Sequence, residues 1–217
     1  MTILLSAIEL SKSYGAFRAL QPTDLALEAG QVTLLTGPNG AGKSTLLLCL
    51  AGLLRPTSGR ILVDGHDLHR AEVAARQALA FVPDVPRFYA ELTAWEHLFF
   101  IAQAHHCADG FDQRAEILMK DFGLWDARHL YPHHYSRGMR LKLGLLLALI
   151  RPFKVLLLDE PTSALDQQST TLLLGRLAAL RHGGVAILLS SHNPALTETL
   201  APRHLYIAGG EISEGAR

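Results

Sequence analysis

Cysteine is scarce in this sequence. Its 217 residues include two cysteines, Cys49 and Cys107, which lie far apart along the chain. Small secreted domains that depend on disulfides carry several cysteines at regular spacing. We therefore expect no disulfide framework, and two isolated thiols fit a protein of the reducing cytosol.

An excess of charge of either sign is also lacking. Twenty basic residues balance twenty acidic ones, so the formal net charge is +0. Proteins that bind a nucleic-acid backbone usually present a broad basic face. The balance argues against such a face, and we expect no nucleic-acid partner.

Long apolar runs are missing as well. The longest, Leu143 to Ile150, is far shorter than the roughly 18 to 20 residues that span a bilayer. The first residues, Met1 to Leu5, lack a basic segment and a small-residue cleavage site, so no signal peptide is expected. Any role at a membrane would then come through a partner.

Hydrophobic residues make up 49% of the chain, which is enough for a sizeable core. Short apolar runs alternate with amphipathic segments, a pattern typical of an α/β domain. We expect one domain over residues 1–217, with an antiparallel β-subdomain at the N-terminus and a mixed, largely parallel sheet. An α-helical subdomain of roughly residues 85–150 would be inserted in this core. The expected strands are 2–10, 23–28, 31–36, 60–63, 78–82, 155–158 and 185–190 with a hairpin over 205–213, and the expected helices are 71–77, 93–106, 109–122, 136–151 and 167–181.

A glycine-rich loop between an apolar strand and an apolar helix is the strongest signal. It matches the phosphate-binding pattern G-x-x-x-x-G-K-[ST], with backbone N–H groups that can surround a polyphosphate. The alternative is a chance glycine turn before a helix. The loop implies a P-loop NTPase that binds a nucleoside triphosphate, but by itself it does not choose among kinase, GTPase, motor and transporter ATPase. Its residues are Gly37, Pro38, Asn39, Gly40, Ala41, Gly42, Lys43, Ser44 and Thr45.

Two adjacent carboxylates, Asp159 and Glu160, end the apolar run that begins at Val155. In a P-loop protein, Ser44 and an aspartate at such a strand end hold Mg²⁺. A glutamate beside that aspartate can orient or deprotonate the attacking water. The alternative for Glu160 is a solvated carboxylate beside Pro161.

Three further residues are candidates for the same site. His192 ends the next buried strand and could sense the γ-phosphate, although a single histidine is often structural. Asp84 follows another strand, at the place where open α/β sheets carry ligand-binding groups. Tyr14 could stack on an adenine, or it could simply pack in the core.

Taken in order, these motifs resemble the nucleotide-binding subunit of an ATP-binding cassette (ABC) transporter over essentially the whole chain. The resemblance implies an ATPase with Lys43, Glu160 and His192 in catalytic roles and Tyr14 as the adenine-stacking aromatic. It places the signature at Ser136, Arg137, Gly138 and Met139, the D-loop at Ser163 to Asp166, and the Q-loop position at Asp84.

The same resemblance implies a composite site. Two copies, or this chain and a related one, would meet head to tail, and the signature of one would close over the ATP bound by the other. The expected cofactors are ATP and Mg²⁺, the latter held by Ser44, Asp159 and Asp84. The expected location is cytoplasmic, on the inner face of the cell membrane, through a transmembrane permease subunit.

Three residues depart from the usual family pattern. Asp84 stands where the family usually has glutamine, Arg137 replaces a glycine, and Met139 replaces a polar residue. Together with Leu92 to Leu98, this pattern is similar to the ABC-2 type exporters of drugs, lipids, polysaccharides or ions. The alternatives are a soluble ABC ATPase of translation or DNA repair, and a binding module without hydrolytic activity.

Overall fold

A computed structural model describes residues 2–215 and divides them into two compact units. The first comprises residues up to Phe81, Phe153–Glu160 and residues from Arg176 onward. The second comprises Val82–Pro152 and Pro161–Gly175, so it is larger than the expected insertion of roughly 85–150. Residues 161–175 belong to the second unit because they lie against residues 82–152 in space, although residues 153–160 separate the two segments in the sequence. Within the described residues, no helix is both long and apolar enough to cross a membrane.

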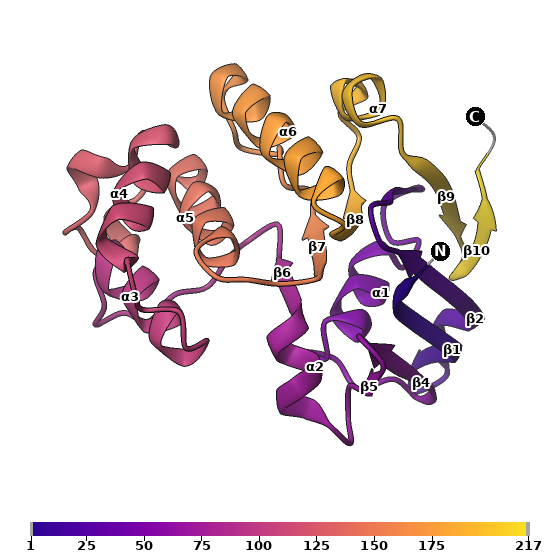
Figure 1. Cartoon of the computed structure of the whole chain (residues 1–217). Helices are drawn as coiled ribbons and strands as arrows, with labels where there is room; N and C mark the ends of the chain where they lie inside the picture. Colours follow the sequence, from indigo (N-terminus) through magenta and orange to yellow (C-terminus); the bar gives the residue numbers. More distant parts are fainter. Residues whose placement is uncertain (1, 216–217) are drawn as a thin grey trace. The chain divides into compact units, whose positions relative to one another are not determined.

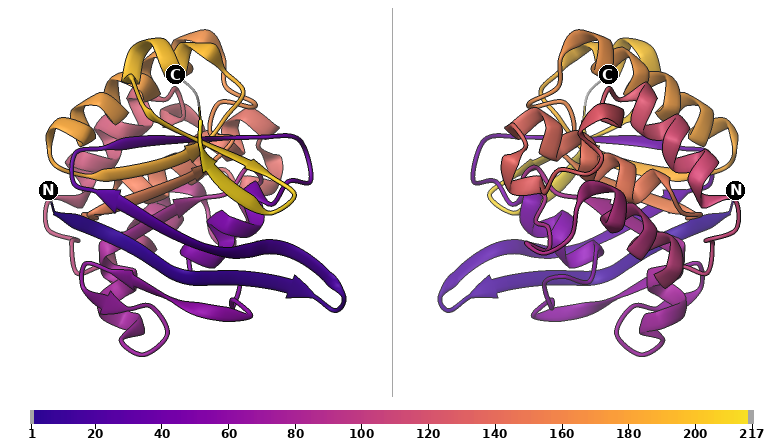
Figure 2. Two further views of the ribbon diagram at one scale, coloured as in Figure 1. Left: turned by 90° about the vertical axis from the view of Figure 1, so that its right-hand side faces the viewer. Right: turned by 90° about the vertical axis from the view of Figure 1, so that its left-hand side faces the viewer.

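The first unit contains a four-stranded antiparallel sheet with the strand order β2-β1-β4-β5. Its long hairpin pairs β1 (Ile3–Tyr14) with β2 (Phe17–Glu28), from Ile3 opposite Glu28 to Tyr14 opposite Phe17. These strands extend beyond the expected 2–10 and 23–28, because cross-strand pairing holds the polar residues near the turn in the sheet. The left view of Figure 2 shows the hairpin as two long neighbouring strands. The shorter partners are β4 (Ser58–Val63) and β5 (His66–Asp67).

A six-stranded mixed sheet follows, in the order β10-β9-β3-β8-β7-β6. Strand β3 (Val32–Thr36) runs parallel to β8 (Ala186–Ser190) and to β9 (Arg203–Ala208), while β10 (Glu211–Glu214) closes an antiparallel hairpin with β9. Strand β7 (Val155–Asp159) is parallel to β8, and every residue of both strands is buried. The remaining edge is β6 (Leu79–Val82). Because parallel strands end at the same side of a sheet, the segments after β3, β7 and β8 emerge together.

Helix α1 (Lys43–Leu50) connects the two sheets in one leucine-rich core. Leu46, Leu47 and Leu50 are fully buried and share a cluster with Leu5 of β1 and Leu157 of β7. Burying a leucine side chain stabilises the fold by roughly 1.5–3 kcal/mol. The start of α1, and with it Lys43, is therefore held in a fixed place. Helices α2 (Glu72–Ala78) and α7 (Pro194–Leu200) complete this unit together with the end of α6 (Gln167–His182).

The second unit is helical, and α3 (Ala94–Ala104), α4 (Phe111–Asp121) and α5 (Arg137–Leu149) lie together in Figure 1. Thr93 and Glu96 form a reciprocal capping box that begins α3. The Trp95 ring lies 5.0 Å from that of Phe111, between centroids, so this aromatic residue packs inside the unit. Two single-turn 3₁₀ helices, η1 (Trp125–Ala127) and η2 (Pro132–His134), lead into α5. The α/β fold, with its mixed sheet, antiparallel β-subdomain and helical part, was expected from the sequence and is confirmed.

Candidate functional site

The glycine-rich loop lies between β3 and α1, as the sequence predicts. Close packing requires two of its glycines, Gly37 and Gly42. Gly37 has φ +150°, and a Cβ there would lie 2.1 Å from the carbonyl oxygen of Ile207; at Gly42, with φ +110°, it would lie 2.7 Å from that of Ala19. A Cβ at Gly40 would meet nothing within 4 Å. The loop is thus tightly packed against the backbone at Gly37 and Gly42 and has open space at Gly40.

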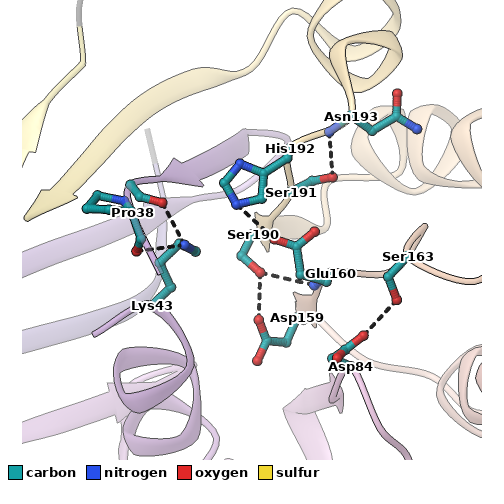
Figure 3. A network of polar contacts seen from close by, with 11 residues as sticks. Pro38, Lys43, Asp84, Asp159, Glu160, Ser163, Ser190, Ser191, His192 and Asn193 are labelled. Carbon is teal, nitrogen blue, oxygen red and sulfur yellow. Dashed lines mark hydrogen bonds and ion pairs between the residues drawn. The ribbon is translucent and has the colours of Figure 1, made fainter. Parts of the chain in front are cut away.

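Lys43 begins α1, and 9% of its surface is exposed. Its ammonium donates hydrogen bonds to the backbone oxygens of Gly37 (2.7 Å) and Pro38 (3.1 Å), and Figure 3 shows Lys43 beside Pro38. A buried ammonium needs such partners, because an unpaired one would pay a large desolvation penalty. Both partners are neutral carbonyls, so the Lys43 charge is available to an anion that enters the loop.

Ser190, at the end of β8, links the two carboxylate residues at the end of β7. Its hydroxyl donates to Oδ1 of Asp159 over 2.6 Å, and the backbone N–H of Glu160 donates to Oγ (3.0 Å) and to the carbonyl oxygen (3.1 Å) of Ser190. Figure 3 shows this chain of contacts. The sequence analysis missed Ser190, whose only signal is that it is a polar residue ending a buried strand.

Glu160 adopts the left-handed conformation, with φ +46°. Its carboxylate lies 3.6 Å from Nε2 of His192. Burial raises the pKa of Glu160, and the charge of nearby Asp159 raises it further, whereas His192 and Lys43 lower it; the net direction is upward. A carboxylate with a raised pKa is a better proton acceptor than an ordinary one.

Most of the predicted nucleotide-binding residues of the first unit line one cavity of about 260 Å³. Tyr14 is half exposed at its edge rather than packed in the core, and its neighbour Phe17 is a second aromatic that the sequence analysis did not select. A larger hollow of about 830 Å³ near the starts of β3 and β9 contains none of the predicted site residues. The smaller cavity is lined by Tyr14, Phe17, Ala19, Asn39, Gly40, Gly42, Lys43, Ser44, Thr45, Asp159 and Glu160.

The remaining predicted residues belong to the second unit. Ser136 caps α5, as expected, and its hydroxyl accepts a hydrogen bond from the N–H of Met139. Asp84, predicted as a metal ligand, accepts hydrogen bonds from Ser163 (2.6 Å) and Arg137 (3.3 Å). These three residues therefore form one cluster, and the metal role of Asp84 stays a prediction.

Asp166, also in the second unit, forms an ion pair with Lys142 of α5 over 2.8 Å. The hydrogen bond from Lys142, and a further one from the N–H of Ser169, hold the pKa of Asp166 well below its usual range. The segment of Ser163 to Asp166 is thus attached to α5 at two points along the helix.

Known proteins resemble this chain in both sequence and fold. Residues 20–163 match the family model described as ABC transporter. The chain is 30% identical to the ABC-type transporter ATP-binding protein EcsA of Bacillus subtilis (strain 168), over 96% of this chain and 85% of that protein. It is 37% identical to the daunorubicin resistance ATP-binding protein DrrA3 of Streptomyces coeruleorubidus, over 94% of this chain, but it spans only 65% of that longer relative.

Among solved structures, the ATP-binding subunit of an ABC transporter is 30% identical and has a TM-score of 0.90, over 97% of this chain and 90% of that one. A dimeric ATP-binding cassette in a post-hydrolysis state, bound to ADP and Pi, has a TM-score of 0.86 at 21% identity, over 97% and 98% of the two chains. The second similarity concerns the fold alone.

Proposed function

The chain belongs to the ABC transporter family as a nucleotide-binding subunit, and from this premise we propose that it binds and hydrolyses ATP to drive an exporter. The observation that carries the proposal is one cavity lined by Lys43, Ser44, Asp159 and Glu160. The first two residues are more than a hundred positions away from the last two in the sequence. Phosphate-binding, metal-binding and proton-accepting groups are thereby gathered in one place.

The loop and Lys43 would hold the phosphates of ATP. The open space at Gly40 leaves room for them, and the positive end of α1 favours their charge. Lys43 would exchange the carbonyl oxygens of Gly37 and Pro38 for phosphate oxygens, which are stronger, charged acceptors. The ring of Tyr14, at the edge of the cavity, would stack on the adenine.

Mg²⁺ fits the donors of this cavity, because the hydroxyl of Ser44 and the carboxylate of Asp159 both line it and oxygen ligands suit that ion. When bound, Mg²⁺ neutralises charge that develops on the phosphates. Ser190 fixes the orientation of Asp159 through its 2.6 Å hydrogen bond. The metal role predicted for Asp84 from the sequence is not needed for this cavity, because Asp84 does not line it and its carboxylate accepts hydrogen bonds from Ser163 and Arg137.

Glu160 would accept the proton of the attacking water, and His192 would orient the carboxylate and contact the γ-phosphate. The double hydrogen bond from the N–H of Glu160 to Ser190 keeps the main chain of this residue in place. Its side chain is therefore directed by the sheet and not by a mobile loop.

We further propose that two nucleotide-binding subunits, identical or related, pair head to tail, so that Ser136, Arg137, Gly138 and Met139 of one reach the ATP of the other. Ser163 and Asp166 would lie at the same contact. The solved ATP-binding cassette that is dimeric has the same fold as this chain, and its support for such pairing is limited to that similarity of fold. The signature residues lie at the N-terminus of α5, which favours an anion.

The pair would act with a transmembrane permease on the cytoplasmic face of the membrane. EcsA is named as a transporter protein and DrrA3 as a drug-resistance protein, which favours an exporter over a soluble ATPase of translation or DNA repair. Co-purification of the chain with a permease from solubilised membranes, and its loss from the membrane when that permease is deleted, would test this part.

Hydrolysis is tested with two variants of the whole chain. Lys43→Ala should weaken ATP binding by at least tenfold in calorimetric titration. Glu160→Gln should bind ATP with unchanged affinity, release no phosphate, and accumulate as a dimer in size-exclusion chromatography with ATP. The matched control is Lys120→Ala, which removes a surface lysine paired with Glu116. This variant should change neither the affinity for ATP nor the rate of phosphate release. Normal turnover by Glu160→Gln would exclude Glu160 as the base.

A further inference from the structure

The segment Ser163 to Asp166 is packed against the first turns of α5 without spare room. A Cβ at Gly138 would lie 2.6 Å from the carbonyl oxygen of Ala164, so a side chain at this position would collide with the backbone. Lys142, one turn further along α5, holds Asp166. The two segments therefore touch at the helix start and again one turn later.

Asp84 joins the same contact from a third part of the chain. One oxygen, Oδ1, accepts hydrogen bonds from Oγ of Ser163 (2.6 Å) and from Nη2 of Arg137 (3.3 Å). Figure 3 shows the carboxylate of Asp84 directed at Ser163. Arg137 also lies within 3.5 Å of that hydroxyl, so the three side chains form a closed triangle.

The triangle contributes little to folding stability. The side chains of Asp84 and Arg137 are 37% and 62% exposed, and exposed ion pairs are weak because water screens them. Its effect is on position. Arg137 is the first residue of α5, where the partial positive charge of the helix end repels a cation. The carboxylate of Asp84 offsets this repulsion and holds the guanidinium beside Ser163.

We propose that Asp84 is a positioning residue that fixes the start of α5 against the segment Ser163 to Asp166, so that Arg137 and Ser136 present one fixed arrangement to the nucleotide of the second subunit. This inference rests on the proposed function. It gives the two unusual residues, Asp84 and Arg137, a joint role.

The first test is a double-mutant cycle in the whole chain with Asp84→Asn, Arg137→Gln and both changes together. Small displacements of positioned groups lower turnover strongly. We expect each single change to lower kcat about tenfold, with the affinity for ATP and Mg²⁺ in calorimetric titration within twofold of wild type. The double variant should be no slower than the slower single variant. Multiplying effects would overturn the proposal, and so would a loss of Mg²⁺ affinity in Asp84→Asn, which would make Asp84 a metal ligand.

The matched control is Glu116→Gln, which breaks the exposed Glu116–Lys120 ion pair in the same unit and should leave kcat unchanged. Ser163→Ala should slow turnover like Asp84→Asn, and Ser163→Thr should restore it because it retains the hydroxyl. Equal losses in the alanine and threonine variants would contradict the role of the hydroxyl.

A second measurement does not depend on ATP hydrolysis. Hydrogen exchange followed by mass spectrometry should show at least fivefold faster exchange in Asp84→Asn over residues 136–142 and 163–166, and unchanged exchange over residues 43–50. Unchanged exchange in the first two segments would overturn the proposal. If the wild-type chain did not hydrolyse ATP, the proposed function would fail, and this measurement would still decide whether Asp84 positions α5.

Discussion

The Nε2 atom of His192 lies 3.6 Å from Oε1 of Glu160. Glu160 directly follows β7 and His192 lies two residues beyond the end of β8, so the parallel pairing of these two strands brings the side chains together. The proposed base therefore has a histidine beside it. The pH dependence of ATP hydrolysis tests whether His192 influences Glu160.

Glu160 accepts a proton only when it is ionised, and burial raises its pKa above the ordinary value of 4.5. As pH falls, the base should therefore become protonated earlier than an exposed glutamate would. We expect kcat to fall on the acidic side at a pH above 4.5. His192→Asn should lower kcat and move this fall to higher pH, because His192 lowers the pKa of Glu160. Phosphate release measured from pH 5 to 9 checks both; a profile in His192→Asn that moved to lower pH would contradict the pairing.

Ser190→Ala should destabilise the fold. The hydroxyl is the donor to the buried carboxylate of Asp159, and its loss leaves that acceptor without this bond. We expect the free energy of unfolding in urea to fall by about 1–3 kcal/mol. Ser191→Ala is the matched control, because the neighbouring buried hydroxyl accepts from the neutral N–H of Asn193. A larger loss in Ser191→Ala than in Ser190→Ala would argue against the carboxylate contact.

Gly37→Ala separates steric packing from backbone conformation. An added Cβ would lie 2.1 Å from the carbonyl oxygen of Ile207, and the positive φ is itself unfavourable. We expect about 2–4 kcal/mol of destabilisation in urea unfolding. Gly15→Ala is the control: φ is +59° there, but a Cβ would meet nothing within 4 Å, so it should cost only about 1 kcal/mol. Equal effects would show that the contact with Ile207 can relax.

The two thiols should differ in reactivity. Cys49 is fully buried in α1, and burial raises its pKa to about 11, so the reactive thiolate is suppressed. Cys107 is partly exposed. With a thiol-specific reagent at pH 8, we expect Cys107 to be modified quickly and Cys49 only after addition of denaturant. Cys107→Ser is the control, and fast modification of that variant in the native state would contradict the burial of Cys49.

Much of the first unit could be predicted because its signals are local. The run of Gly37 to Thr45 fixes strand, loop and helix together, and Asp159 follows an apolar run that is recognisable as a buried strand. The limits of β1 and β2 were less predictable, because Lys12 and Ser13 lack an alternating pattern and are held in the sheet by their partners across the hairpin.

Relationships between distant residues could not be predicted in this way. Residues 161–175 belong to the second unit, where Ser163 donates a hydrogen bond to Asp84 and Asp166 pairs with Lys142. Neither leaves a periodic pattern in the sequence. Ser190 is similar: its role becomes visible only when β8 is placed beside β7 in register.

The peptide bond between Glu160 and Pro161 is one of four places at which the chain passes from one unit to the other, and it directly follows the proposed base. The pyrrolidine ring restricts rotation about the N–Cα bond of Pro161, and the N–H of Glu160 is anchored twice to Ser190. Proline also restricts ψ of the residue before it, so the backbone of Glu160 is constrained on both sides. The left-handed φ of +46° at Glu160 is thereby maintained, so the proposed base needs no backbone rearrangement before it accepts a proton.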